Sequence, residues 1–200
     1  MRKLAFLVTA AVAGFLLFVA PPAAAQSGGL CQLNGTANIT PGLSNTSGNF
    51  TFTFSGALSG CQSNDSTAPT QGAVGIGQTI VVNGLVAQEP AATGSGSCAN
   101  SDGSGIAIVS WADGTTTVVS FTTQAVTGAV NLSGSVMDSV TLPVVNPQPG
   151  QPTTVTVTTT RYAGDQVQGA VSFQADPTQC AGSGVTSAAV SGAVGVGRAQ

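Results

Sequence analysis

Short segments rich in β-branched and aromatic residues follow one another along this chain, separated by glycine, serine and asparagine. The clearest segment has Phe50, Phe52 and Phe54 alternating with threonine and serine, so the three rings share one face of an extended strand. Beyond residue 25, no segment combines a helical apolar repeat with helix caps. Short strands divided by turn residues are typical of sandwiches and barrels. We therefore expect an all-β fold, an antiparallel β-sandwich that is immunoglobulin-like or a related barrel.

The alternation also places the individual strands. We expect them at residues 34–40, 50–58, 73–77, 79–82, 106–111, 115–123, 126–136, 153–162, 167–173, 185–190 and 193–196. Residues 106–111 are apolar on both faces, which predicts a central strand covered from two sides. Asp113 and Gly114 follow this strand, and because both residues tolerate positive φ they predict a hairpin turn.

The first 25 residues have the pattern of a secretory signal peptide. Two cations at positions 2 and 3 precede an apolar run over residues 4–20, and small residues at 23–25 form a cleavage pattern. The apolar run is too short and wrongly flanked to be a membrane span of the mature protein. We expect a bacterial protein that is secreted, extracellular and without a stable membrane span once the signal is removed. Lipidation at Cys31 is an alternative, although Leu30 stands where a lipoprotein signal needs a small residue.

Residues 26–200 are enough for one domain with a sizeable core. Residues 143–152 form a proline-rich, linker-like stretch. Two domains divided at this stretch are one possibility. A disulfide crossing it favours the other, a single β-sandwich domain with an extended loop.

The charge of the expected mature chain excludes two classes of partner. Only Arg161 and Arg198 remain as cations against seven carboxylates, and the sequence contains no histidine. Nucleic-acid binding requires several cations to neutralise phosphates, so we expect none. Attachment through a polybasic surface to anionic lipids is excluded for the same reason.

Four cysteines in an exported chain predict two disulfides. If residues 34–40 and 50–58 form a hairpin that folds about residues 45–46, Cys31 and Cys61 face each other at its open end. Facing strand positions are about 4.5–5.5 Å apart, within disulfide range. We therefore prefer Cys31–Cys61, which leaves Cys98–Cys180. A zinc site is the alternative, but the cysteines lack the close pairs that zinc sites use.

The residue types of most catalytic and cofactor sites are missing. Without histidine there is no Ser-His-Asp or Cys-His machinery, and no phosphate-binding or dinucleotide motif leads from a strand into a helix. A glycosidase with two carboxylates needs no histidine, but the acids here stand beside turn residues. Residues 100–105 resemble part of a calcium loop without its closing glutamate. We expect no enzyme activity, no cofactor and no metal.

Trp111 and Tyr162 are the only large amphipathic rings. Such rings form stacking platforms for sugars, so both are candidate ligand-stacking residues. Trp111 ends an apolar strand, and packing in the core is the competing interpretation. Tyr162 follows a threonine-rich segment and stands beside Arg161, which makes it the better candidate for an exposed ring.

Three segments carry a resemblance to a known group of proteins. They are residues 54–61, which read Phe-Ser-Gly-Ala-Leu-Ser-Gly-Cys, the Gly-Thr-Ala strand at residues 35–37, and residues 94–98, which end at Cys98. Together with the late Cys180 they resemble small secreted β-rich proteins of actinobacteria that are largely uncharacterised. The resemblance implies bacterial export and a β fold, and it brings no catalytic residues with it.

The leading hypothesis is therefore a secreted, non-enzymatic β-sandwich protein with a structural or binding role at the cell exterior. Its partner is not identified by the sequence, and a cell-surface glycan or protein fits such a role. One alternative is a carbohydrate-binding module that uses Tyr162 or Trp111. Another is a secreted hydrolase with paired carboxylates. A third is a self-assembling surface protein, because nearly uncharged strands without lysine leave sheet edges open to pairing.

Overall fold

A computed structural model of the chain describes residues 28–197; the expected signal peptide, residues 1–25, and Arg198 lie outside this range. The described residues form thirteen strands and one short helix. The strands of the main sheet are β1 (Gly29–Leu43), β2 (Gly48–Ser63), β3 (Gly72–Ile76), β6 (Ala92–Gly96), β7 (Asn100–Trp111), β8 (Thr116–Val126), β9 (Ala129–Met137), β12 (Gln166–Gln174) and β13 (Val185–Gly197). The other elements are β4 (Thr79–Val82), β5 (Leu85–Gln88), β10 (Ser139–Pro143), β11 (Thr154–Thr158) and the helix α1 (Pro177–Ala181).

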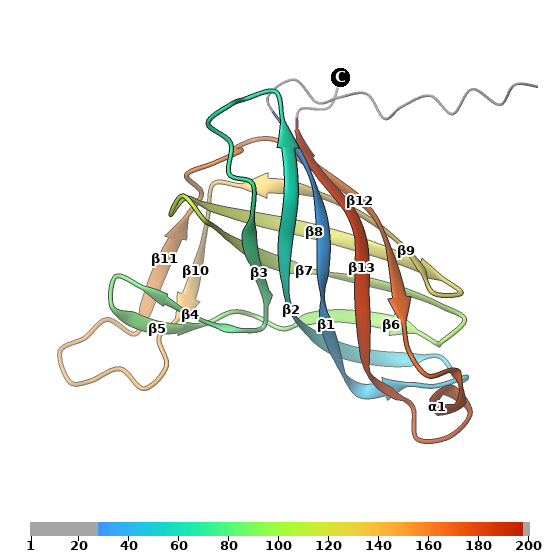
Figure 1. Cartoon of the computed structure of the whole chain (residues 1–200). Coiled ribbons are helices and arrows are strands. Elements are labelled where there is room, and N and C mark those ends of the chain that lie inside the picture. Colours follow the sequence, from blue (N-terminus) through green and yellow to red (C-terminus); the bar gives the residue numbers. More distant parts are fainter. Residues whose placement is uncertain (1–27, 198–200) are drawn as a thin grey trace, which may run out of the picture.

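The main sheet closes on itself as an antiparallel barrel (Figure 1). Hydrogen-bonded neighbours run in the order β1-β13-β12-β9-β8-β7-β3-β2, and β2 pairs again with β1. The all-β class is confirmed, but the expected sandwich is not, because a sandwich keeps two separate sheets face to face. In a closed barrel each of these strands has a neighbour on both sides, and apolar residues on the inner face form the core.

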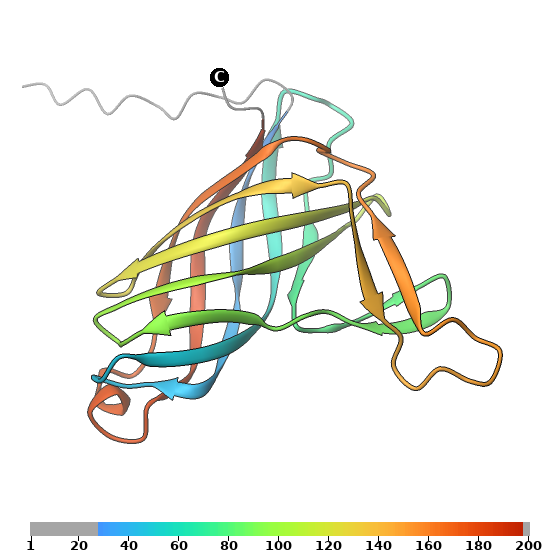
Figure 2. The same ribbon diagram turned by 180° about the vertical axis from the view of Figure 1, so that it is seen from behind.

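One position in the barrel wall is shared by two short strands. Both β3 and β6 pair with β2 on one side and with β7 on the other. Between them, residues 77–91 leave the wall and form the hairpin β4–β5. The hairpin β10–β11 lies beside it, and Figure 2 shows the two hairpins projecting together from one side of the barrel. We call them the side hairpins.

The side hairpins cover part of the outer face of the barrel. Ile108 of β7 and Val118 of β8 form a cluster with Ala87, Leu142 and Val157 of the side hairpins. Alternate residues of β7, such as Val109, belong to the core inside the barrel. The prediction that residues 106–111 are covered on both faces is therefore confirmed, since the lumen lies on one side and the side hairpins on the other.

The predicted β1–β2 hairpin is confirmed together with its register. Leu33 faces Leu58 and Thr40 faces Thr51, which places the fold of the hairpin at residues 45–46. Cys31 and Cys61 form the expected disulfide, with Cα atoms 4.0 Å apart. Cys98 and Cys180 form the second one. The turn at Asp113 and Gly114 also joins two paired strands, β7 and β8.

Other expected boundaries are wrong. The strand expected over residues 126–136 is interrupted at Thr127 and Gly128, whose φ angles of 47° and 85° form a tight hairpin turn between β8 and β9. The strand expected over 153–162 is confined to β11, and the two expected over 185–196 are one strand, β13. The proline-rich residues 143–152 lie in and beside the connection between β10 and β11.

The helix α1 was not expected from the sequence. Asp176 caps it by accepting a hydrogen bond from the Thr178 N–H, and Pro177 occupies its first turn. An Asp-Pro pair is a helix-start signal as well as a turn signal, so the sequence contained the information. No helix among the described residues is long and apolar enough to cross a membrane.

Candidate functional site

The barrel encloses a cavity of about 410 Å³. All eight strands of the closed ring contribute apolar side chains to its wall, and the largest are five phenylalanines. These are Phe50, Phe52, Phe54, Phe121 and Phe173. Cavities of roughly 300–1,000 Å³ with such walls are typical of small-molecule sites. Phe50, Phe52 and Phe54, whose rings the sequence places on one face of a strand, therefore form part of the wall of a candidate ligand site.

Several phenylalanine rings lie directly on glycine backbone of the inner wall. A Cβ atom added at Gly35 or Gly56 would collide with the end of the Phe54 ring, and one added at Gly94 would collide with the Phe50 ring. Because glycine has no side chain, the rings can approach the wall this closely. Glycines in these strands therefore seat the large rings against the wall and leave the middle of the barrel free.

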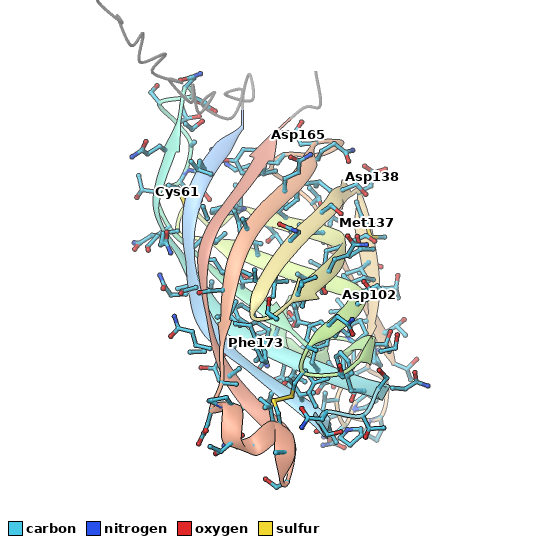
Figure 3. All side chains as sticks on the ribbon, turned by 90° about the vertical axis from the view of Figure 1, so that its right-hand side faces the viewer. Cys61, Asp102, Met137, Asp138, Asp165 and Phe173 are labelled. Atoms are coloured by element: carbon cyan, nitrogen blue, oxygen red, sulfur yellow. A yellow bond between two sulfur atoms is a disulfide. The ribbon has the colours of Figure 1, made fainter. Side chains whose placement is uncertain are left out.

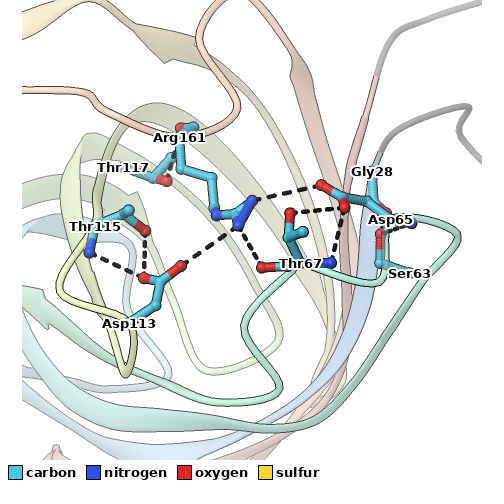
Figure 4. A network of polar contacts seen from close by, with 8 residues as sticks. All are labelled: Gly28, Ser63, Asp65, Thr67, Asp113, Thr115, Thr117 and Arg161. Carbon is cyan, nitrogen blue, oxygen red and sulfur yellow. Dashed lines mark hydrogen bonds and ion pairs between the residues drawn. The ribbon is translucent and has the colours of Figure 1, made fainter.

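A polar network closes one end of the barrel (Figure 4). Arg161 lies 3.7 Å from the Asp65 carboxylate and 3.4 Å from that of Asp113, and it donates a hydrogen bond of 2.7 Å to the Thr67 carbonyl. The Cys31–Cys61 disulfide lies at the same end, because Gly29 and Ser63 pair there beside the loop that carries Asp65. We call this end the arginine end.

The pKa values at the arginine end do not favour acid catalysis. Hydrogen bonds from the hydroxyl and N–H of Thr67, assisted by Arg161, hold the pKa of Asp65 below its ordinary value. Thr115 and Arg161 lower the pKa of Asp113 in the same way. A glycosidase needs one carboxylic acid that stays protonated near neutral pH. Asp65 and Asp113 are both ionised there, and they bind Arg161.

The two candidate stacking residues meet at the arginine end. Trp111 is buried, and its indole N–H donates a hydrogen bond of 2.8 Å to the Thr117 hydroxyl. Tyr162 is half-buried; its ring packs edge-on against Trp111 at 5.6 Å between centroids, and the Arg161 guanidinium lies 5.5 Å from its centre. Both rings thus have protein partners, and the pair plugs this end of the barrel below the polar network.

The cavity extends instead toward the opposite end, which carries α1 and the Cys98–Cys180 disulfide. We call this the helix end. Figure 3 shows the disulfide in yellow beside α1, with Phe173 next to it and Asp165 at the far end of the barrel. The exposed residues Thr127 and Pro177 contribute to the cavity lining here.

The segments around the helix end are tied to one another. The Cys98 N–H donates to the Ser44 carbonyl at 2.9 Å, and the Asn45 N–H donates to the Cys180 carbonyl at 3.1 Å. The Thr127 N–H donates to the Ala99 carbonyl at 2.9 Å. The disulfide thus belongs to a ring of linked turns at the rim of the cavity.

Polar side chains in the cavity lining are few and gather at the helix end. Ser97, Ser101 and Thr123 line this part of the cavity with hydroxyl groups. Residues 100–105, considered above as a fragment of a calcium loop, are part of the regular strand β7. Among residues 28–197, no three potential metal ligands come together.

One buried carboxyl lies outside the lumen, under the side hairpins. Glu89 is 2% exposed; its Oε2 accepts a hydrogen bond of 3.1 Å from the Gln78 N–H, and its Oε1 has no hydrogen-bond partner. Burial raises the pKa of Glu89 to about 6. Sequence reasoning missed this residue because a single glutamate before Pro90 has the pattern of an ordinary turn.

Comparison of the chain with protein-family models, with curated proteins and with solved structures finds no match.

Proposed function

We propose that this protein is a non-enzymatic binding protein that works outside the cytoplasm and holds one small apolar molecule inside its barrel. The observation that carries the proposal is the apolar cavity of about 410 Å³ between the Trp111–Tyr162 plug and the helix end. The interior of an eight-stranded barrel is either filled by its own side chains or holds one small ligand, and the cavity here fits the second case.

An apolar cavity of this size is costly to keep without an occupant. Protein interiors are normally close-packed, and residual cavities destabilise by roughly 24 cal/mol per Å³. The apolar side chains that line the cavity here lack packing partners on their inner side and forgo the dispersion contacts of a filled core. A ligand that fills the space removes this penalty, so the cavity supports a binding role.

The location outside the cytoplasm rests on the cysteines and on the N-terminus. Two disulfides indicate an oxidising environment. The signal-peptide pattern over residues 1–25 supports secretion. The absence of histidine from the sequence and the ionised, arginine-bound state of Asp65 and Asp113 support a non-enzymatic role.

Self-association at the cell exterior is a second candidate, and one observation favours it. Val81 and Val86 face each other across the hairpin β4–β5 and are 72% and 43% exposed. An apolar patch on a short hairpin is a site where another chain can pair. Sedimentation velocity over a range of concentrations tests this candidate, and a protein that stays monomeric at millimolar concentration contradicts it. The stacking and hydrolase hypotheses have no comparable support.

Binding in the cavity is tested with a neutral, environment-sensitive fluorophore such as N-phenyl-1-naphthylamine and the purified secreted protein. We expect saturable binding of one molecule per chain. Val130 lines the cavity, and the adjacent Asn131 is exposed on the outer face of β9. Val130→Trp fills part of the cavity and should weaken binding at least tenfold. Asn131→Trp places the same side chain outside and should leave binding unchanged; equal effects of the two variants would contradict the proposal.

A further inference from the structure

We propose that the molecule held in the barrel is electrically neutral, with a hydroxyl or carbonyl group that faces the hydroxyls of Ser97, Ser101 and Thr123 at the helix end. This inference rests on the proposed function, because it names the ligand class of the same cavity. It separates lipid-like molecules by the charge of their head group: alcohols and ketones are accepted, whereas carboxylates and ammonium compounds are rejected.

The first argument is the position of the cation. Arg161 is the one cationic side chain among residues 28–197. It lies at the arginine end, where it pairs with Asp65 and Asp113 and donates to the Thr67 carbonyl. The Trp111–Tyr162 plug lies between it and the cavity, whose lining includes neither of these rings. A carboxylate ligand would therefore be transferred from water into an apolar space without a counter-charge, which is strongly unfavourable.

The second argument is the placement of the acidic side chains, which excludes a cationic ligand. Among the described residues that line the cavity, Asp102 is the one with an ionisable side chain, and it is exposed. Its neighbours Ser101 and Gly103 occupy the alternate positions of β7 that face inward. Asp176, near α1, accepts hydrogen bonds from the N–H and hydroxyl of Thr178. Neither carboxylate reaches into the lumen to pair with an ammonium group.

The third argument is the distribution of hydroxyl groups. Apolar side chains surround the middle of the cavity, and Ser97, Ser101 and Thr123 add hydroxyls only toward the helix end. A hydroxyl can donate or accept a hydrogen bond, so it matches an uncharged alcohol or carbonyl. A ligand with one such group is expected to lie with its apolar part toward the Trp111–Tyr162 plug.

The test compares three molecules that differ only in their head group. Decan-1-ol, decanoate and decylammonium compete with N-phenyl-1-naphthylamine for the protein at pH 7.5. We expect decan-1-ol to bind at least tenfold more tightly than either ion. Lowering the pH to 4 protonates most of the carboxylate, whose pKa is near that of a glutamate side chain, about 4.3. The affinity of decanoate should then approach that of the alcohol, which serves as the control for effects of pH on the protein.

A pair of lysine variants asks whether the missing charge is the cause. Ala125 lines the cavity near the rim, and the adjacent Gln124 is exposed on the outer face of β8. Ala125→Lys supplies a cation to the cavity and should raise the affinity for decanoate at least tenfold at pH 7.5. Gln124→Lys changes the net charge equally and should have no effect.

The outcomes separate this inference from the proposed function. If the fluorophore and decan-1-ol both fail to bind, the cavity is not a ligand site and the proposed function is wrong. If the fluorophore binds but decanoate or decylammonium competes as well as decan-1-ol at pH 7.5, the cavity is a ligand site and the inference of a neutral ligand is overturned.

Discussion

The carboxyl group of Glu89 lies against the backbone of Gly75 on the outer side of the barrel wall. A Cβ atom at Gly75 would come within 2.7 Å of both carboxyl oxygens. Val74 and Ile76 line the lumen, so the intervening Gly75 faces outward, toward the side hairpins. The glycine thus provides the space in which a carboxyl group is buried between two apolar layers, with one hydrogen bond from Gln78.

This burial predicts a stability that falls as pH rises. The pKa of Glu89 is raised from an ordinary 4.5 to about 6, so the native state binds the proton more tightly than the unfolded chain. The stabilising effect of the proton is complete below pH 4.5 and is lost as pH rises through 6. It amounts to about 2 kcal/mol. Glu89→Gln mimics the protonated form and should raise the free energy of unfolding by up to this amount at pH 7.5.

Urea unfolding at pH 4.5 and 7.5 provides the measurement. The difference between Glu89→Gln and the natural protein should be present at pH 7.5 and vanish at pH 4.5. Asp65, Asp113 and Asp176 have pKa values below the ordinary 3.8, so their contribution to stability changes only below this window. A difference of the same size at both pH values would show that the charge of Glu89 is not responsible.

The seating of Phe54 on glycine predicts that one methyl group on the wall will reduce ligand binding. In Gly56→Ala the new Cβ collides with the Phe54 ring, which must move into the lumen. We expect affinity for the neutral fluorophore to fall about tenfold. Gly48→Ala is the matched control in the same strand, because nothing lies within 4 Å of its Cβ position.

The Phe54→Leu substitution checks the cause of this effect. In the Gly56→Ala background a smaller side chain at position 54 removes the collision with the ring and leaves the contact of the new Cβ with the Asn34 carbonyl at 2.7 Å, so binding should recover part of the way toward that of Phe54→Leu alone. Circular dichroism of all four proteins establishes that the barrel is intact. If Gly56→Ala binds the fluorophore normally, the ring does not depend on the glycine for its position.

The sequence predicted local pairings better than it predicted how the sheet closes. The β1–β2 register followed from the alternation and from the turn length, and the disulfide Cys31–Cys61 followed from the register. Closure depends on β1 pairing with both β2 and β13, which is a contact between distant parts of the chain. One apolar face per strand is required by a sandwich and by a barrel alike, so the pattern did not separate them.

The residue types at the turns explain some of the other differences between the expected and the observed strands. Asn83 and Gly84 both have positive φ and join β4 to β5, and an Asn-Gly pair between apolar runs is a strong hairpin signal, so the sequence does contain the information for this turn. Thr127 also has a positive φ, which is rare for a β-branched residue, and no sequence rule would have placed a turn there.

The cavity itself could not be predicted from the sequence. Its lining residues have the same apolar, alternating pattern as the residues of a filled core, so pattern alone cannot separate wall from filling. Glu89 was missed for a related reason. Its burial depends on Gly75 and on the side hairpins, which the chain brings together only in the folded barrel.

The two disulfides should differ in their effect on ligand release. Cys98–Cys180 links turns at the rim of the cavity, whereas Cys31–Cys61 lies at the closed arginine end. The double variant Cys98→Ser/Cys180→Ser should release the fluorophore several times faster in stopped-flow displacement, because the rim turns are less constrained. Cys31→Ser/Cys61→Ser is the matched control and should release it at the normal rate; a reversed order would place the exit at the other end.

Both double variants are also expected to lose stability. The disulfides join residues 30 and 82 positions apart, and the chain-entropy model gives roughly 3.5 and 4.5 kcal/mol for loops of these lengths. The Cys98→Ser/Cys180→Ser protein should therefore be the less stable of the two in urea unfolding. Release rates are compared below both unfolding transitions, so a faster release reflects the rim and not unfolded protein.

The hydrogen bonds of Thr117 should stabilise the arginine end without contributing to ligand binding. Its hydroxyl accepts from the Trp111 indole N–H and donates to the Arg161 carbonyl at 3.0 Å, and its side chain is 1% exposed. Thr117→Val keeps the shape but leaves both partners buried without a hydrogen bond. We expect a loss of about 2–3 kcal/mol in the free energy of unfolding.

Trp111 is the chain's only tryptophan, so its fluorescence reports on this network directly. In Thr117→Val its emission should change, while the affinity for the neutral fluorophore should stay within twofold because Thr117 is not part of the cavity lining. Ser120→Ala, on the exposed face of the same strand, should alter neither property. A loss of ligand affinity in Thr117→Val alone, with little change in stability, would mean that the ligand site reaches the arginine end.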